Sequence, residues 1–266
     1  MIDFLKTAVD KALESDNGHL DLFLRFLYGL SLQSNQRLLQ GLLTQEEDNE
    51  QSKKEMVQYI KQKLESNLSP ERSINLFYCL NELNDQTLVK DIQTHLSKGS
   101  LSSVDLSPAQ WSALVFVLLT SEEELEEFEL QKFKKSDECL IRLSAVIKTS
   151  KRALLNDCGL TDKSCPALVT VLGSDTNLKE LNMNNNNLQD SGVELLCTGL
   201  KNINCKLEIL RLNCISITDE GCAALASAFN SNLRELDLSR NQIGDSGVTE
   251  ISSLLRNSKT LQILRV

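Results

Sequence analysis

Residues 178–188 read LKELNMNNNNL, and this stretch decides how the chain folds. Its apolar residues stand at the first, fourth, sixth and last positions, and an asparagine stands at the ninth. The same spacing returns from Leu207 and from Leu233. Weaker copies bring the starts to 96, 125, 150, 178, 207, 233 and 261, separated by 29, 25, 28, 29, 26 and 28 residues. One short motif therefore recurs along most of the chain.

A period of this length is typical of leucine-rich repeats that have room for a full helix in each unit. Each unit is predicted to form a short strand, a turn and an amphipathic helix that returns the chain to the next strand. One unit cannot bury its own apolar face, so neighbouring units stack into a solenoid. We therefore expect an α/β horseshoe of the ribonuclease-inhibitor type, with parallel strands on the concave side and helices on the convex side.

The concave side is the natural contact surface, because the residues that alternate with the leucines in each strand point into it. Acidic and basic residues alternate from strand to strand, which suits a protein surface carrying charges of both signs. The alternative is an ordinary solvated face. The candidate contacts are Glu127, Glu129, Arg152, Glu180, Asn182, Asn184, Arg211, Glu235, Asp237 and Arg265.

Aspartates occupy equivalent places just before four helices. Each carboxylate is predicted to accept hydrogen bonds from free backbone N–H groups in the first turn of the helix that follows it. The frame repeats, so Gly244-Asp245-Ser246-Gly247 is interpreted as part of the repeat and not as the nucleophile motif of a protease, which also needs a base and an oxyanion hole. The four aspartates are Asp162, Asp190, Asp219 and Asp245.

Asparagines around Met183 divide into two groups. Asn186, like Asn241, stands where its amide is predicted to satisfy backbone groups of the turns. Asn182 and Asn184 are left to contact a ligand. Two repeats have an apolar residue at the position of Asn186 and Asn241, namely Ile215 and Phe133. The row of asparagine hydrogen bonds from repeat to repeat is expected to be interrupted there.

A run of acidic residues precedes the second repeat, with six glutamates in eight positions between Glu122 and Glu129. Such a run suits docking of a basic partner, although it is more often simply a solvated face. Paired carboxylates also serve in glycosidases, but those need two acids flanking a substrate cleft, which this repeat frame does not supply.

The composition limits the functional classes. A net charge of −9 disfavours nucleic-acid phosphates as partners. The longest apolar run, residues 113–119, is too short to span a bilayer, and the N-terminus lacks the features of a secretory signal. The eight cysteines include no Cys-x-x-Cys pair, so we predict reduced thiols and no metal site. We expect a cytoplasmic protein without a membrane segment.

The first third of the chain has helical instead of repeat periodicity, including apolar residues at Leu38, Leu39, Leu42 and Leu43. Residues 20–32 are apolar enough to predict a buried central helix. Residues 44–55 contain no apolar residue and are predicted to form a charged connector. Ser69-Pro70 predicts a helix start. We assign residues 1–94 to an all-helical domain that caps the solenoid, and 95–266 to about six repeats plus a truncated seventh strand.

Two linear segments support a resemblance to NOD-like receptors, the NACHT and leucine-rich-repeat proteins of innate immunity. Residues 19–27, HLDLFLRFL, look like part of the second helical domain of those receptors, and residues 106–114, LSPAQWSAL, look like the beginning of their repeats. The arrangement resembles the C-terminal part of such a receptor, and is most similar to the large fish group.

The resemblance also implies what lies outside this sequence. No Gly-Lys-Ser/Thr of a phosphate-binding loop occurs, so ATP or ADP is expected only in a NACHT domain missing from this chain, which itself holds no cofactor. The sequence looks like a partial receptor. Its last repeat stops at Val266 with no capping helix, and an uncapped solenoid is expected to self-associate through its exposed strand edge.

Three functions follow as hypotheses. The first is a non-enzymatic regulatory and recognition segment, in which the repeats sense a ligand or fold back on a NACHT domain, in cis or in trans, to restrain oligomerisation. The second is a free-standing cytosolic inhibitor or scaffold resembling ribonuclease inhibitor, with an acidic concavity for a basic enzyme. The third is a hydrolase dependent on Ser246, which no constellation of residues supports.

Overall fold

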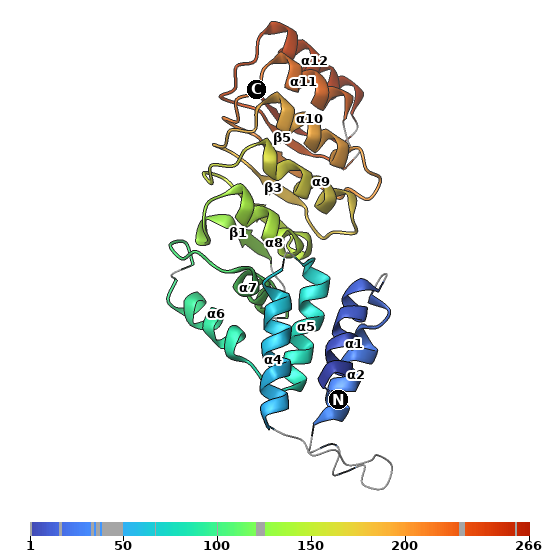
Figure 1. The fold of residues 1–266 in the computed structure, drawn as a ribbon. Helices are drawn as coiled ribbons and strands as arrows, with labels where there is room; N and C mark the ends of the chain where they lie inside the picture. The colour runs from blue at the N-terminus through green and yellow to red at the C-terminus, as the bar shows by residue number, and fades with distance from the viewer. Residues whose placement is uncertain are drawn as a thin grey trace. The chain divides into compact units, whose positions relative to one another are not determined.

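The computed structural model describes residues 2–15, 18–32, 35, 38, 50–66, 68–99, 101–120, 126–228, 232–258 and 260–266. The chain divides into two compact units. Unit 1 contains Met1–Lys98 and Asp105–Thr120, and unit 2 contains Gly99–Val104 and Ser121–Val266. Unit 1 is helical and unit 2 is the repeat solenoid (Figure 1).

Helices of unit 1 pack around apolar side chains that recur every three or four residues. Ser69 caps one of them as predicted, since its side chain accepts a hydrogen bond from the backbone N–H of Arg72 and Pro70 follows at the first helical position. The helices are α1 (Ile2–Glu14), α2 (Asp21–Ser31), α4 (Glu50–Leu64), α5 (Pro70–Glu82), α6 (Thr87–Ser97) and α7 (Pro108–Thr120).

Helix α7 packs against α5 and α6, and Phe116 stacks on Phe77 with ring centroids 5.1 Å apart. By these contacts α7 belongs to unit 1, whereas the predicted boundary at residue 94 places it among the repeats. The weak repeat copy at Leu96 forms no strand in the described residues, because Leu96 is used in α6 and residues 101–103 form a turn. The sheet accordingly has six strands there, and not the predicted seven.

Helix α2 is not a buried central helix, as the prediction had it. Leu24 and Tyr28 are buried against neighbouring helices, but Leu22 is 74% exposed and Phe26 is 63% exposed. The apolar content predicted the helix correctly and did not reveal that one of its faces lacks cover in this chain.

The predicted connector at residues 44–55 is in part helical, because α4 already begins at Glu50. Glutamate, lysine and glutamine favour helices when nothing else competes, which accounts for the earlier start. Residues 44–49, like Leu39, Leu42 and Leu43, lie outside the described residues.

Unit 2 is a leucine-rich-repeat solenoid whose six strands form one parallel sheet in sequence order. The middle residue of each strand from Phe128 to Leu236 is buried, so one face of the sheet is closed by the helices. Figure 1 shows α9 to α12 stacked in order along this unit. The strands are β1 (Glu127–Glu129), β2 (Arg152–Leu154), β3 (Glu180–Asn182), β4 (Ile209–Arg211), β5 (Glu235–Asp237) and β6 (Ile263–Arg265).

The remaining elements of unit 2 return the chain from one strand to the next. The α-helices bury apolar stripes such as Leu168, Leu196 and Leu225. They are α8 (Asp137–Thr149), α9 (Cys165–Gly173), α10 (Gln189–Leu200), α11 (Asp219–Ser227) and α12 (Asp245–Asn257), with short 3-10 turns η2 (Leu130–Lys132) and η3 (Asp162–Ser164).

Asparagine amides tie successive turns together, as the motif predicts. The Asn186 Oδ1 accepts hydrogen bonds from the backbone N–H groups of Cys158 (3.2 Å) and Leu160 (2.9 Å) in the preceding repeat. Asn241 does the same for Ile215 (2.9 Å) and Ile217 (3.5 Å). Ile215 stands at the equivalent position of the repeat between them, where its buried apolar side chain makes no such hydrogen bond.

The aspartates before the helices bind differently from the prediction. The carboxylate of Asp190 accepts hydrogen bonds from Thr218 N (2.9 Å), Thr218 Oγ1 (2.9 Å) and Gly221 N (2.9 Å), all in the next repeat. Asp219 likewise accepts a hydrogen bond from Gly244 N (2.7 Å). The carboxylates of Asp190 and Asp219 therefore each join two repeats.

Seven of the eight cysteines are buried and all are free thiols. Burial raises the pKa of the Cys139 thiol to about 12 and that of Cys158 to about 11. These thiols are protonated and pack as small apolar groups at neutral pH, as predicted. Within the described ranges, no helix combines the length and apolarity needed to cross a bilayer.

Candidate protein-interaction surface

The side chains that flank each buried strand residue form two columns on the open side of the sheet. The strands pair in parallel without a shift in register, so equivalent residues of successive repeats become neighbours, as Glu180, Ile209 and Glu235 do. We call this surface the concave strand face. Its columns are Glu127, Arg152, Glu180, Ile209, Glu235, Ile263 and Glu129, Leu154, Asn182, Arg211, Asp237, Arg265.

Arg211 is at the centre of a chain of ion pairs across four strands. Its Nε lies 3.2 Å from Glu180 and its NH1 nitrogen lies 2.7 Å from Glu235. Arg265 also pairs with Glu235. The side chains of Glu180 and Glu235 are only 16% and 12% exposed, whereas Arg265 is 49% exposed. The inner carboxylates are thus held by arginines, and the outermost arginine remains accessible.

A second cluster occupies the first two strands, where Arg152 pairs with Glu127. Glu129 pairs with Lys132 in the turn after β1, with 2.7 Å between Nζ and Oε1. No described ion pair joins this cluster to Glu180, although Arg152 and Glu180 are register neighbours. The concave strand face therefore consists of two separate ion-pair clusters.

The amides predicted to contact a ligand are partly used inside the protein. Asn184 N donates to Asn182 Oδ1 (3.1 Å), and Asn213 N donates to Asn184 Oδ1 (2.8 Å). Both side-chain oxygens are therefore occupied. Among the described residues, the side-chain NH₂ groups of Asn182 and Asn184 donate to no acceptor, so two donors are left for a partner.

Asp237 is almost buried and accepts hydrogen bonds from the backbone N–H and the hydroxyl of Ser239. Asn213 Nδ2 donates to the same hydroxyl at 2.8 Å. Asp237 therefore fixes the turn after β5. Among the predicted contact residues, Asp237 therefore has a carboxylate that stabilises the turn and is not presented to a partner.

One row of charged residues was missed by the sequence reasoning. It lies one residue before each strand, where Lys179 pairs with Glu208 (2.8 Å), Arg234 also reaches Glu208 (3.6 Å), and Lys151 pairs with Glu126 (2.6 Å). We call these residues the flanking row. A comparison of the residues that directly precede the predicted strands would have shown that acidic and basic residues occur together at this position.

The described acids of the glutamate run are all paired. Glu126 binds Lys151, Glu127 binds Arg152 and Glu129 binds Lys132. Residues 122–124 lie outside the described part, and docking of a basic partner on this run stays a prediction.

The concave strand face and the flanking row together carry almost no net charge. The two columns and the flanking row contain seven carboxylates and six cations, a net charge of −1, compared with −9 for the whole chain. Ion pairs at this level of exposure contribute little to stability, about 0–1 kcal/mol each. Their main effect is to hold charged groups of both signs in set positions, which pre-organises a surface for a complementary protein.

Comparison with known families supports both units. The family model described as NLRC4 helical domain HD2 matches residues 1–91, and the model described as leucine-rich repeat matches residues 174–197, 204–226 and 229–252. The first match covers α1 to α5 and the beginning of α6, and the second covers the repeats around β3 to β5.

Curated relatives match this chain over different lengths. The bovine NACHT, LRR and PYD domains-containing protein 3 is 42% identical over 113 residues, which are 42% of this chain and 11% of the relative. Its rat counterpart is 27% identical over an alignment of 267 residues, covering 92% of this chain and 25% of the relative. Pig ribonuclease inhibitor is 42% identical over 96 residues, which are 35% of this chain and 21% of the inhibitor.

The chain thus spans at most about a quarter of the length of these relatives. All three are mammalian proteins, so they do not test the expected similarity to the fish group, which stays a prediction.

Proposed function

We propose that this chain, which is the second helical domain and leucine-rich-repeat part of a NOD-like receptor, serves as a non-enzymatic regulatory and recognition segment in the cytosol. Leucine-rich repeats generally mediate protein–protein interactions, and the bovine and rat relatives carry NACHT domains by name. The segment binds a NACHT domain, in cis or in trans, through the concave strand face. Binding restrains that domain until a ligand competes for the same surface.

The observation that carries this proposal is the ion-pair chain around Arg211. Glu180, Arg211 and Glu235 are held at hydrogen-bonding distance on three successive strands, and Arg265 extends the chain outward. Charged groups held in this way lose little conformational freedom when a partner binds. Charges of both signs then favour one binding register and disfavour others.

The binding of nucleotide is assigned to the NACHT partner and not to this chain. A phosphate-binding loop needs backbone N–H groups and a lysine in a Gly-rich turn, and this sequence has no such motif. Catalysis by Ser246 is not part of the proposal, because the frame of Gly244-Asp245-Ser246-Gly247 recurs at residues 189–192 and 218–221 as a feature of the repeat. The contribution of this chain is contact, not chemistry.

A second candidate is an inhibitor or scaffold of the ribonuclease-inhibitor type, favoured by the identity of 42% over 96 residues to the pig inhibitor. That function was expected to use an acidic concavity against a basic enzyme. The concave strand face and the flanking row together carry a near-neutral, internally paired charge, which gives little long-range attraction to a basic enzyme. We therefore place this candidate second.

A titration distinguishes the two candidates. The purified chain is titrated into an isolated NACHT-containing segment and, separately, into a pancreatic-type ribonuclease, and heat is recorded. The proposal predicts binding to the first, weakened about tenfold or more by Arg211→Glu, which repels Glu180 and Glu235 and removes the partner's acidic contact. Arg142→Glu is the matched control, since Arg142 pairs with Glu138 within α8, away from the strands.

Equal affinity of the Arg211→Glu and Arg142→Glu variants would place the binding surface elsewhere. Stoichiometric binding of the ribonuclease alone would favour the inhibitor.

A further inference from the structure

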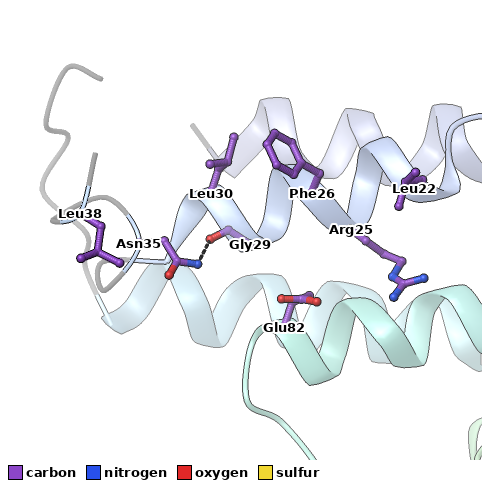
Figure 2. A pocket seen from close by; sticks show the side chains of 8 residues that line it. All are labelled: Leu22, Arg25, Phe26, Gly29, Leu30, Asn35, Leu38 and Glu82. Carbon is purple, nitrogen blue, oxygen red and sulfur yellow. Dashed lines mark hydrogen bonds between the residues drawn. The ribbon is translucent and has the colours of Figure 1, made fainter. Parts of the chain in front are cut away.

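Helices α2 and α5 of unit 1 run parallel and leave a groove between them. Three neighbouring pairs show the direction: Asn75 donates a hydrogen bond to Asp21, the Arg25 guanidinium lies 4.2 Å from the centre of the Tyr78 ring, and a Cβ at Gly29 would lie 3.6 Å from Glu82 Oε2. The groove has a volume of about 440 Å³ (Figure 2).

The wall of the groove is an apolar stripe on α2. Leu22, Phe26 and Leu30 are spaced four residues apart and therefore lie one above another on the helix. Leu22 and Phe26 are largely exposed. A contiguous apolar stripe of this kind marks an interaction site more often than a solvated surface.

The groove also carries one charged side chain of each sign. Figure 2 shows Arg25 projecting from α2 and Glu82 projecting from α5 toward the space between them. The Arg25 guanidinium lies over the Tyr78 ring, but its Nε is buried without a hydrogen-bond acceptor, and none of the ion pairs among the described residues includes Glu82. Two charges of opposite sign therefore lie about one helical turn apart along the groove, without an ion-pair partner among the described residues.

We infer that this groove is the contact surface of a symmetric dimer, whose occupant is a second copy of this chain. A two-fold interface uses the same patch on both copies, so the patch must complement itself. This one does, because it holds an apolar stripe flanked by one cation and one anion. When α2 meets α2 of the second copy in antiparallel orientation, Arg25 reaches Glu82 of the second copy and Glu82 reaches its Arg25.

Gly29 permits the close approach that such a dimer needs. With the two-fold axis between Phe26 and Gly29, the ring of Phe26 lies over Gly29 of the second copy, where no side chain opposes it. Asn35 Nδ2 donates to the Gly29 carbonyl oxygen at 2.7 Å and fixes the C-terminal end of α2 (Figure 2). The interface lies on unit 1 and is independent of the function proposed for the concave strand face.

Sedimentation equilibrium of the full chain tests the inference. Wild type at about 100 µM is expected to give a mass near twice 29.7 kDa. Arg25→Glu alone and Glu82→Arg alone each juxtapose like charges, and each is expected to weaken dimerisation at least about tenfold. An equimolar mixture of the two variants pairs opposite charges at both contacts and is expected to restore the dimer. Recovery on mixing cannot come from misfolded chains.

Two further variants locate the surface. Phe26→Glu is expected to give monomers, and Ile203→Glu, at an apolar residue that is 96% exposed in unit 2, is expected to leave the dimer intact. A monomeric wild type would overturn the inference. So would a mixture of Arg25→Glu and Glu82→Arg that stays monomeric, or a dimer that is lost on Ile263→Arg in β6 and unaffected by Phe26→Glu.

Discussion

Replacing Asn186 by alanine removes one side chain that joins two repeats. The Asn186 amide accepts from Cys158 N and Leu160 N, and its Nδ2 donates to Leu155 O (2.9 Å) and Met183 O (2.8 Å). The side chain is 6% exposed, so water does not replace these bonds without rearrangement of the turn.

The magnitude follows from the backbone groups that lose their partners. Each buried N–H without an acceptor costs about 1–3 kcal/mol, and carbonyl oxygens cost less because local relaxation often re-pairs them. Two orphaned N–H groups at Cys158 and Leu160 therefore predict a loss of about 2–6 kcal/mol in the free energy of unfolding. A domain of ordinary stability has about 5–15 kcal/mol in total, so the loss is large.

Urea unfolding followed by far-ultraviolet circular dichroism measures this loss as a fall in the midpoint with an unchanged slope. Asn187→Ala is the matched control: the neighbouring residue is an exposed asparagine for which no side-chain hydrogen bond is described. Its effect should stay within about 0.5 kcal/mol. If both variants lose the same amount, the inter-repeat role of the Asn186 amide is refuted.

Three further predictions use the same unfolding assay. Cys214→Gly should raise the free energy of unfolding by about 0.5–1 kcal/mol, because Cys214 has a φ of 54° in the left-handed region; Cys214→Ala should give no gain. Gly221→Ala should lower it by about 1–3 kcal/mol, because the new Cβ would lie 2.5 Å from Asp190 Oδ1 and displace the carboxylate that joins two repeats; an unchanged midpoint would contradict this. The hydrogen bond from Lys63 holds the pKa of Asp10 below its usual value, so the ionised carboxylate stabilises the fold above its unfolded pKa, and this contribution is lost as the pH falls through the lower folded pKa. Asp10→Asn should therefore make the free energy of unfolding depend less on pH below about pH 4. An unchanged pH dependence in that range would argue against the ion pair.

Strand positions could be predicted because the repeat motif places a buried residue at the centre of each strand. Leu181, Leu210 and Leu236 are each at most 1% exposed at those centres. The two charged columns followed from the alternation of side chains along a strand. The pairing of Arg211 with both neighbours could not be predicted, since it depends on the register of three strands and on side-chain rotamers.

Other features were outside the reach of the sequence because they depend on how elements stack. The carboxylate of Asp190 was predicted to serve its own helix, and its actual partners at Thr218 and Gly221 come close only once the next repeat is in place. The exposure of Phe26 was missed for a related reason: the apolar content of α2 shows that the helix needs cover, not which other element or molecule provides it.

Affinity capture tests most directly the claim that the concave strand face binds a NACHT domain. The immobilised wild-type chain and its Arg211→Glu and Arg142→Glu variants are incubated with immune-cell cytosol in moderate salt, and the retained proteins are quantified by mass spectrometry. The account predicts a NACHT-containing chain on wild type and on Arg142→Glu, and its depletion on Arg211→Glu. Retention of a soluble ribonuclease in equimolar amount, with no NACHT-containing chain on any of the three, would contradict it.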